Sequence, residues 1–395
     1  MVVVADDLTG AADTGVQFAR VGLPAHVWLG RHAAPRHGAV VYDANSRSLA
    51  PAAAARRVGR LARAIAHAPT TLVYKKIDST VRGNVGAEVE ALLRALGRRL
   101  AVVAPAFPAN GRTTRGGVQL VAGVPVHLTA AARDPAHPMP HASIAEALGS
   151  QSTLPIAEVG LDEVRGRLGA ALREALARGP AFAVVDAETD EDLARIAEAV
   201  MALGSAALPV GSAGLAGQLA RRLGGPAPSP RPSPPARREA RRALVVCGSL
   251  NPATVAQIGE LEAVLGTRAT DPLTGGVGVP AEGPIVLSTA ARRVDAAAPA
   301  VARRIAGRVA RLVERAGADA LVLTGGDVAR AVLDRLGAEG VELVDEVLPG
   351  MPAGRIVGGA AAGWPVVTKA GGFGPPDALV RALRYLQTSD REETA

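Results

Sequence analysis

The chain reads Val2-Val-Val-Ala-Asp-Asp-Leu-Thr-Gly-Ala-Ala-Asp-Thr-Gly15 near its beginning, and this stretch indicates the fold. Its short β-branched run predicts a buried strand over Val2–Ala5, and the alanine-rich residues that follow predict a helix over Ala11–Arg20. A strand that leads through a polar loop into a helix is the repeating unit of an α/β protein with a parallel sheet.

The same alternation continues along the chain. It predicts further strands over Ala39–Tyr42, Thr71–Lys75, Leu100–Ala104, Ala181–Val185, Ala243–Cys247, Ile285–Ser288, Ala320–Leu323 and Pro365–Thr368. It predicts further helices over Pro51–His67, Ala87–Arg98, Leu161–Ala177, Asp190–Leu203, Pro252–Leu265, Ala298–Ala316 and Asp327–Leu336. A helix is also expected directly after Gly214.

Length and composition point to two domains. A chain of 395 residues is longer than one hydrophobic core usually serves, and Gly224–Arg238 is rich in Pro, Gly, Ser and Arg, which is typical of a linker. We expect one domain over 1–225, a linker over 226–242 and a second domain over 243–395. The predicted architecture is α/β, with two α/β domains, mainly parallel sheets and a ligand cleft between the domains.

Several classes of protein are disfavoured. The formal net charge is +7, but the basic residues are scattered and rarely lie beside aromatics, so we expect no nucleic-acid partner. The single cysteine, Cys247, lies in an apolar run and excludes an internal disulfide or a multi-thiolate metal site. No apolar run approaches the roughly 20 residues that span a bilayer, and acids interrupt the first run early. We therefore expect a cytoplasmic protein without a membrane partner.

The lysines and asparagines are rare enough to be informative. Lysine occurs only as Lys75, Lys76 and Lys369, whereas arginine carries nearly all the other positive charge, and asparagine occurs only at positions 45, 84, 110 and 251. Lysine supplies a compact ammonium that arginine does not replace. All seven residues fall in segments that contain Gly, Asp or Ser, which favours functional roles over chance clustering.

The first half of the chain carries candidate groups after four predicted strands. Asp6 and Asp7 face the carboxyl end of the sheet, where ligands bind, although one of them can simply cap the following helix. Arg47 offers a planar fork for a carboxylate or is a surface residue in a capping turn. Asn110 and Arg112 lie in a rigid loop that contains prolines. They either reach the same crevice or only stabilise a turn.

The densest polar segment is Tyr74-Lys-Lys-Ile-Asp-Ser-Thr-Val-Arg-Gly-Asn-Val-Gly86. A structural loop rarely needs so many convergent polar groups, so we interpret it as a binding site for a polyhydroxy acid. The candidate residues are Lys75, Lys76, Asp78, Ser79, Arg82 and Asn84.

The second half contains four glycine-rich turns, three of them directly after predicted strands. They contain Gly248 and Ser249, then Gly325, Gly326 and Asp327, then Gly350, Met351, Pro352 and Ala353, and finally Gly371 and Gly372. Backbone N–H groups at such turns bind phosphate, and together the turns make a nucleotide site credible. There is no Walker-type loop, the run Gly276-x-Gly278 is a poor dinucleotide fingerprint, and no metal ligands are predicted.

Taken together, these segments resemble the four-carbon acid sugar kinase family, long catalogued as a domain of unknown function. The resemblance rests on motifs in family order: Ala5-Asp-Asp-Leu-Thr-Gly-Ala, Lys75-Lys-Ile-Asp-Ser-Thr-Val-Arg-Gly-Asn, Pro105-Ala-Phe-Pro-Ala-Asn-Gly-Arg-Thr, Gly211-Ser-Ala-Gly-Leu-Ala, Gly248-Ser-Leu, Thr324-Gly-Gly-Asp and Lys369-Ala-Gly-Gly-Phe-Gly. They span nearly the whole chain.

The resemblance implies an ATP-dependent transfer of phosphate to the C4 hydroxyl of threonate, erythronate or a 3-oxo-tetronate, with Mg²⁺. It implies acid contacts at Asp7, Arg47 and residues 75–82, and nucleotide contacts at Ser249, the turn 350–353 and Gly372. We add Asp7, Lys76 and Lys369 as candidate catalytic residues, because phosphoryl transfer depends on positioning and charge neutralisation. A sugar-acid dehydrogenase and a non-catalytic sugar-acid sensor are the alternatives, and a homodimer stays open.

Overall fold

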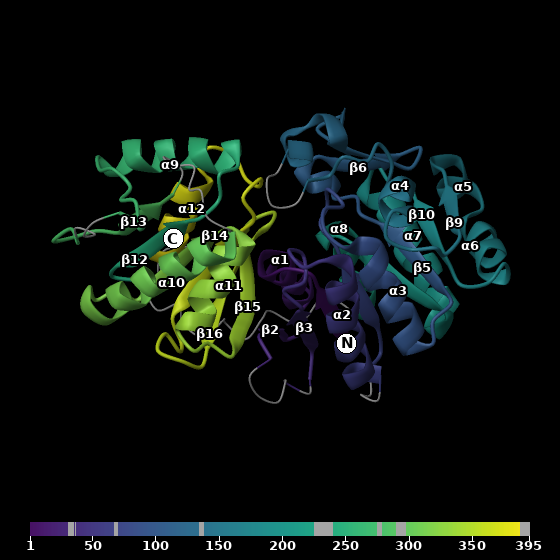
Figure 1. The fold of residues 1–395 in the computed structure, drawn as a ribbon, viewed down its shortest axis with the longest axis horizontal. Coiled ribbons are helices and arrows are strands. Elements are labelled where there is room, and N and C mark those ends of the chain that lie inside the picture. The colour runs from purple at the N-terminus through teal and green to yellow at the C-terminus, as the bar shows by residue number, and fades with distance from the viewer. Residues whose placement is uncertain are drawn as a thin grey trace, which may run out of the picture. The chain divides into compact units, whose positions relative to one another are not determined.

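The computed structural model divides the chain into two compact units (Figure 1). The first comprises Met1–Val21 and Ala39–Gly225, and the second comprises Gly22–Gly38 and Pro226–Ala395. The structure describes residues 1–30, 35, 37–66, 70–133, 138–224, 240–274, 279–289 and 298–387. Most of the expected linker, and the run Gly276-x-Gly278, lie outside these described residues.

The first unit is built on a seven-stranded sheet in which all neighbouring strands are parallel. Its order is β3 (Ala39–Asp43), β1 (Val2–Ala5), β4 (Val73–Lys76), β11 (Ala207–Gly211), β5 (Leu100–Ala104), β10 (Ala181–Val185) and β9 (Ile156–Val159). The loops after β1, β3 and β4 therefore leave adjacent strands at the same edge of the sheet.

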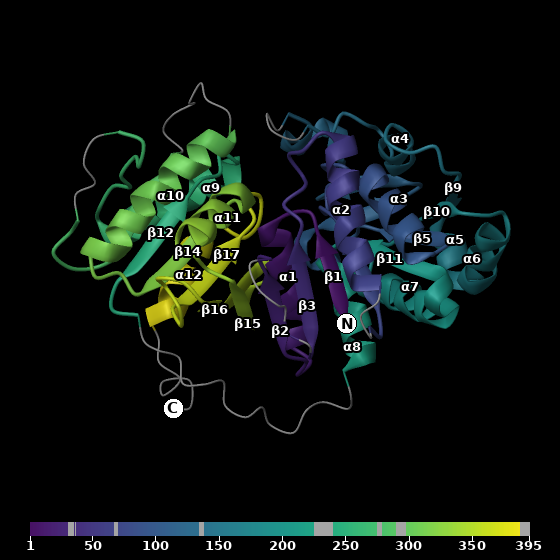
Figure 2. The same cartoon turned by 60° about the horizontal axis from the view of Figure 1, so that its bottom comes forward.

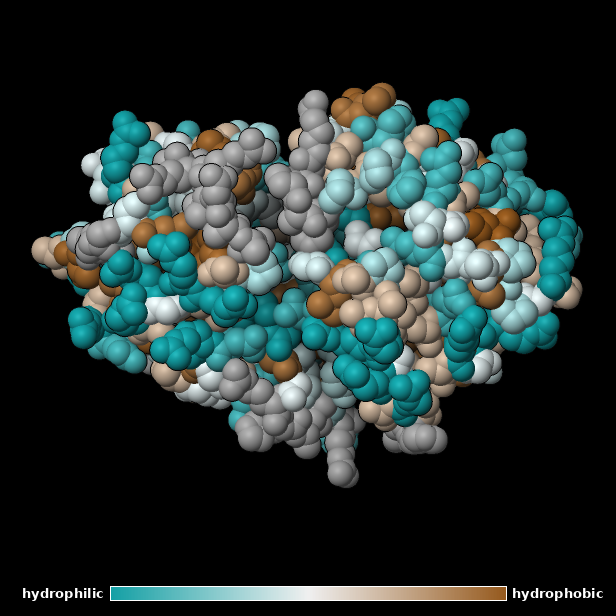
Figure 3. Space-filling model, viewed as in Figure 1, coloured by the Kyte–Doolittle hydropathy of each residue, from teal (hydrophilic) through white to brown (hydrophobic). Residues whose placement is uncertain are grey.

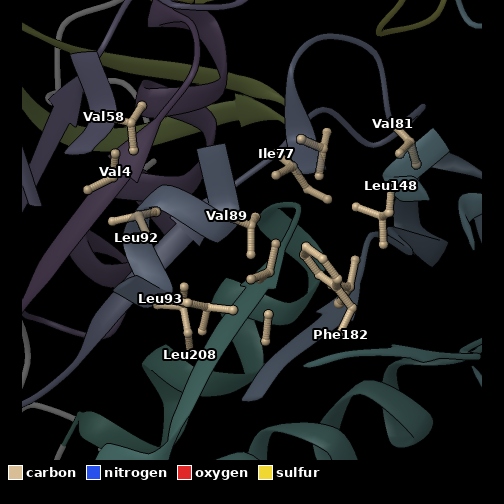
Figure 4. Close-up of a cluster of buried hydrophobic side chains, with 14 of the residues drawn as sticks. Val4, Val58, Ile77, Val81, Val89, Leu92, Leu93, Leu148, Phe182 and Leu208 are labelled. Carbon is tan, nitrogen blue, oxygen red and sulfur yellow. The ribbon is translucent and has the colours of Figure 1, made fainter. Parts of the chain in front are cut away.

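Helices cover both faces of this sheet (Figures 1 and 2). On one face α2 (Pro51–Ala66), α3 (Val85–Leu96) and α4 (Ile144–Gly149) contribute to a core of aliphatic side chains and Phe182 (Figure 4). On the other, α1 (Leu8–Ala19) and α7 (Asp190–Leu203) both pack against α8 (Ala213–Leu223). The core is built almost wholly from Val, Leu, Ile and Ala, as the scarcity of aromatics requires.

A small antiparallel sheet lies beside the main one in the first unit. It consists of β6 (Arg112–Arg115), β7 (Val118–Val121) and β8 (Val124–Pro125), which the sequence did not predict. Asp186 accepts hydrogen bonds from the N–H groups of Gly116 and Gly117, which fixes the hairpin to the end of β10. The helix expected over Leu161–Ala177 is interrupted at Arg167, giving α5 (Leu161–Gly166) and α6 (Leu168–Ala177).

The second unit has a mixed sheet. Its parallel half is β13 (Ile285–Ser288), β12 (Ala243–Cys247), β14 (Ala320–Thr324) and β17 (Pro365–Lys369). Its antiparallel half is β16 (Met351–Val357), β15 (Gly340–Leu348) and β2 (Ala25–Trp28). The sequence predicted the parallel strands but none of the antiparallel ones, and β2 comes from a segment expected in the first domain.

The described residues of the second unit also form the helices α9 (Pro252–Leu265), α10 (Ala298–Arg315), α11 (Gly326–Arg335) and α12 (Ala378–Gln387). The helices α10 and α11 pack against each other, as do α9 and α12. Cys247 lies buried in the core between α9, α12 and the sheet, as expected for a small apolar side chain. The predicted fold class, two α/β units with mainly parallel sheets, is confirmed.

The face shown in Figure 3 is largely hydrophilic, and its apolar side chains form small separate groups. Among the described residues, no helix combines the length and the apolar character needed to cross a membrane.

Candidate functional site

The predicted polar residues of the first unit meet around one guanidinium. Arg47 donates from Nε to Asp6 Oδ2 at 2.7 Å and from Nη2 to Asp6 Oδ1 at 2.9 Å. It also donates from Nη1 and Nη2 to the two carboxylate oxygens of Asp7, both at 2.9 Å. Four of its five N–H donors are thus committed. Arg47 neutralises two neighbouring carboxylates, which leaves it little capacity to clamp the carboxylate of a ligand.

Asp7 is also the N-cap of α1. Its Oδ1 accepts from the N–H of Gly10 at 3.0 Å, and its Oδ2 accepts from the Thr9 hydroxyl at 2.8 Å. The sequence left two roles open for the paired acids, a helix cap and a functional group. Asp7 has both positions, since it caps α1 and also faces the polar cluster. Of its donors, only the Thr9 hydroxyl can rotate away and yield its place to a ligand hydroxyl.

Asp6 is held in its ionised form. Burial by itself raises the pKa of Asp6, but Arg47, Lys75 and Lys76 outweigh it and hold that pKa below its usual value. A carboxylate of this kind is a strong hydrogen-bond acceptor and a weak base.

A second ion pair lies next to the first. Arg82 donates to both oxygens of Asp78, from Nε at 2.8 Å and from Nη2 at 3.1 Å. The Thr80 hydroxyl also donates to Asp78. Burial raises the pKa of Asp78, but Arg82, Arg47 and these hydrogen bonds hold it well below its usual range. This pair shapes the loop that follows β4.

Lys76 is the cation of this cluster that remains uncommitted. It is only 3% exposed, and within the part of the chain that the structure describes, no hydrogen bond or ion pair is made by its ammonium. A Cβ placed on Gly10 would lie 2.7 Å from Lys76 Nζ and 2.6 Å from Asp7 Oδ1. The ammonium and the carboxylate therefore flank the first turn of α1, and a buried cation in this position needs an anion.

Lys75 points the other way, because successive strand residues face opposite sides of a sheet. Its ammonium is fully buried and pairs with Glu88 of α3, with Nζ–Oε2 at 2.7 Å. It also donates to the carbonyl of Lys76 at 2.9 Å. The structure thus gives Lys75, a predicted acid-binding residue, an internal structural partner instead.

Of two other predicted residues, Asn84 also has internal partners, whereas Ser79 does not. Asn84 donates from Nδ2 to the carbonyls of Ser46, Arg47 and Leu49, so it fixes the loop that carries Arg47. Ser79 is buried, and its Oγ has no hydrogen-bond partner among the described residues. An unpaired buried hydroxyl is costly unless a ligand satisfies it. We therefore keep Ser79 as a candidate ligand contact and assign Asn84 to support.

In the second unit three glycine turns converge on Ser249. A Cβ on Gly371 would overlap Ser249 Oγ, and a Cβ on Gly325 would lie 3.7 Å from the Ser249 backbone nitrogen. Gly248 donates its N–H to the carbonyl of Thr324 at 3.1 Å, which joins the ends of β12 and β14. These positions form a close-packed backbone surface that side chains would fill. Gly326 and Asp327 begin α11 beside it.

The fourth predicted turn lies within the β15–β16 hairpin. Gly350 has a left-handed φ of +82° and donates its N–H to Glu346 Oε1 at 2.9 Å. Met351 and Ala353 are buried in the core, and Met351 Sδ would lie 3.5 Å from a Cβ on Gly374. The hairpin, which includes Pro352, thus packs against the glycine loop after β17 through Met351.

That loop is held by donors from two elements. Lys369 is buried, and its ammonium contacts the carbonyls of Ala370, Gly371 and Phe373 at 2.9, 3.3 and 3.1 Å. Two α9 residues that the sequence analysis missed complete the set: Thr254 donates to Gly371 O, and Gln257 donates to the carbonyls of residues 373–375. The sequence did carry a signal for Thr254 and Gln257, because they are polar residues three positions apart on a helix face that is otherwise apolar.

Neither a metal cluster nor the open pocket competes with these sites. Among the described residues, no group of three His, Cys, Asp or Glu side chains could hold a metal ion. An open pocket of about 490 Å³ is lined by Arg241, Arg242, Glu282 and Gly317. It lies at the amino ends of the strands of the second unit, whereas ligands of open α/β sheets bind at the carboxyl ends.

Comparisons with known proteins match two segments of the chain to models of domain families. Residues 1–219 match the model of a sugar-binding N-terminal domain, and residues 279–379 match that of a nucleotide-binding C-terminal domain. The chain is 40% identical to a D-threonate kinase of Bordetella bronchiseptica, over 98% of this chain and 97% of that protein. It is 33% identical to a D-erythronate kinase of Heliobacterium modesticaldum, over 100% and 98%.

A solved structure supports the fold. The protein described as a putative tRNA synthase from Salmonella typhimurium LT2 aligns with a TM-score of 0.77, over 97% of this chain and 98% of that chain. Its sequence is 24% identical, so this likeness bears on the fold alone.

Proposed function

Since this chain belongs to the four-carbon acid sugar kinase family, we propose that it transfers the γ-phosphoryl group of ATP to the C4 hydroxyl of threonate, erythronate or a related four-carbon acid. The chain is a kinase of such acids, and the position of transfer and the choice of acid are what we add. The observation that carries the proposal is the uncommitted, buried Lys76 ammonium beside the paired carboxylates of Asp6 and Asp7.

The acid site offers complementary groups for a small hydroxy acid. Lys76 supplies a charge for the substrate carboxylate, and the first turn of α1 adds a positive helix end next to it. Asp7 and Ser79 supply an acceptor and a hydroxyl for substrate hydroxyl groups. Arg47 acts indirectly, because its hydrogen bonds hold both aspartates in place.

Asp7 orients the attacking hydroxyl. Its oxygens already accept hydrogen bonds from Arg47, Gly10 and Thr9, so it is a well-fixed hydrogen-bond acceptor. Phosphoryl transfer passes through a loose transition state in which positioning matters more than strong base catalysis. This assignment narrows the role expected from the sequence, where orientation and deprotonation were both open.

The second unit suits the phosphates of ATP. Gly248, Ser249, Gly325 and Gly371 form the close-packed backbone surface that a phosphate needs in order to approach N–H groups. Mg²⁺ would neutralise the phosphates, and without a three-acid cluster among the described residues it would be held mainly by the nucleotide itself. We propose that activity requires a divalent cation, with Mn²⁺ able to replace Mg²⁺.

The test is a coupled ADP-release assay on a panel of D- and L-threonate, D-erythronate and 3-oxo-tetronates, with a five-carbon acid as a control. We expect turnover with at least one four-carbon acid, loss of turnover in excess chelator, and a ³¹P spectrum of a C4 phosphate ester. Lys76→Met should raise the KM for the acid at least about tenfold, because an uncompensated charge contact is lost. Arg381→Met, which removes an exposed ion pair with Asp377, is the matched control. An absence of ADP release with every four-carbon acid would overturn the proposal.

A further inference from the structure

The loop 370–375 of the second unit carries an arrangement that the proposed function does not by itself explain. Lys369, at the end of β17, is buried among carbonyl oxygens, and no carboxylate is found beside its ammonium within the described part of the chain. A buried ammonium without a counter-ion is costly. Because Lys369 is fully buried and its ammonium donates to carbonyls of its own loop, contact with a transferring phosphate does not account for it.

The donors beneath the loop determine which way its peptide groups face. Lys369, Thr254 and Gln257 together donate to the carbonyls of residues 370, 371, 373, 374 and 375. All peptide bonds of the described residues are trans, so the C=O and N–H of one peptide group point in opposite directions. The N–H groups of Gly371 and Gly374 therefore point away from the donors.

The N–H of Phe373 is consistent with this geometry. It donates to the carbonyl of Ala370 within the turn, and the carbonyl of its own peptide group, that of Gly372, is not among those the three donors hold. Backbone N–H groups that point out of one turn on the same side bind anions. A positive charge directly behind that turn strengthens its field toward an anion in front of it.

We propose that Lys369 is a positioning residue of the nucleotide site, which acts with Thr254 and Gln257 through the loop 370–375 to present its N–H groups to phosphate. Lys369 does not itself touch the phosphate. The inference rests on the proposed function, because it assumes that the anion is the phosphate chain of ATP or ADP.

The charge of Lys369 is sensitive to pH near the physiological range. Burial lowers the pKa of Lys369 to about 8, while Cys247 on β12 acts weakly in the opposite direction. Burial in turn raises the pKa of Cys247 to about 11, so the thiol stays neutral wherever Lys369 titrates. The groups that face Lys369 from α9 are the neutral Thr254 and Gln257. An anion bound in front of the loop favours the charged lysine, so binding takes up a proton.

The experiment measures the binding of MgADP by calorimetry to the full-length wild type, Lys369→Met, Thr254→Val and the control Gly259→Ala, whose added methyl group meets nothing within 4 Å. We expect Lys369→Met to raise Kd at least about tenfold, corresponding to roughly 1.4 kcal/mol, and Thr254→Val to raise it about threefold. The affinity for threonate should be unchanged in both.

Proton uptake is measured by repeating the titration in buffers of different ionisation enthalpy. The wild type should take up part of a proton on binding MgADP at pH 8, and its Kd should rise several-fold between pH 7 and pH 9. Both effects should be absent in Lys369→Met.

Three outcomes would overturn the inference. One is a folded Lys369→Met protein with the wild-type Kd and pH profile. Another is a loss of kcat with unchanged Kd, since that would place the ammonium on the transferring phosphate. If Lys369→Met does not fold, an unchanged Kd in Thr254→Val contradicts the inference instead. Failure of the wild type to bind MgADP would instead contradict the proposed function, so the two failures are distinguishable.

Discussion

Gly10 is the residue whose missing side chain keeps the acid site open. Its position between Lys76 Nζ and Asp7 Oδ1 leaves no room for a methyl group. Gly10→Ala should therefore displace both groups and lower kcat/KM for the acid on the order of 10- to 100-fold, as small misplacements of reacting groups do. Steady-state kinetics provide the measurement. Gly59→Ala in α2 is the matched control, because the nearest atom to its added methyl group is 3.8 Å away. Equal losses in both variants would contradict this explanation.

Asp78 makes a prediction about acid stability. Its pKa is depressed in the folded protein, so the stabilisation is fully present above the unfolded value near 3.8 and is lost as the pH falls below it. We expect the thermal unfolding midpoint of the first unit to fall steeply between pH 4 and pH 2.5. In Asp78→Asn the midpoint should be lower at pH 7 and should change less over that acidic range. Parallel curves for the two proteins would show that the Asp78–Arg82 pair does not contribute.

At the scale of elements, β4 and α3 are joined through a buried ion pair. Removing one partner of such a pair leaves an uncompensated charge and costs about 3–5 kcal/mol. Lys75→Met should therefore lower the urea midpoint of the first unit strongly, because Glu88 is only 1% exposed. The double variant Lys75→Met with Glu88→Leu should recover most of this loss, since an apolar pair of similar volume replaces the ions. If the double variant is no more stable than the single one, the pair is not what couples the strand to the helix.

The same two elements show what a sequence can predict. Strand alternation placed Lys75 and Lys76 on opposite sides of the sheet, and the structure agrees. The sequence could not tell which side was the core, because Glu88 on α3 gives no local signal of its long-range partner. Most parallel strands were predictable as β-branched runs, but β9 and β11 were not, because Ile156-Ala-Glu-Val159 and Ala207-Leu-Pro-Val-Gly211 contain no such run. The β15–β16 hairpin was not, because its strands carry Glu342, Asp345, Glu346 and Arg355 and alternate poorly.

Backbone conformation was the other part that the sequence could not supply. Val81 has a φ of +62°, which is rare for a β-branched residue. It lies in the loop that carries Asp78, Ser79 and Arg82, where the surrounding hydrogen bonds enforce it. Strain of this kind is concentrated at functional sites, so it supports the loop as part of the acid site. No sequence pattern indicates such a residue in advance.

At the scale of the whole molecule, each candidate site is built from residues of a single unit, so the two should be separable by mutation. Asp7→Asn keeps the volume of the side chain but loses the charge that faces Arg47 and the substrate hydroxyl. Gly371→Ala places a methyl group against Ser249 in the second unit. We expect Asp7→Asn to weaken threonate binding at least about tenfold and to leave MgADP binding near the wild-type value. Gly371→Ala should instead weaken MgADP binding and leave threonate binding near the wild-type value.

Calorimetry with each ligand alone separates these effects, and a cross-effect of a few-fold is within ordinary coupling between sites. Loss of MgADP binding in Asp7→Asn with intact threonate binding would reverse the assignment of the two units.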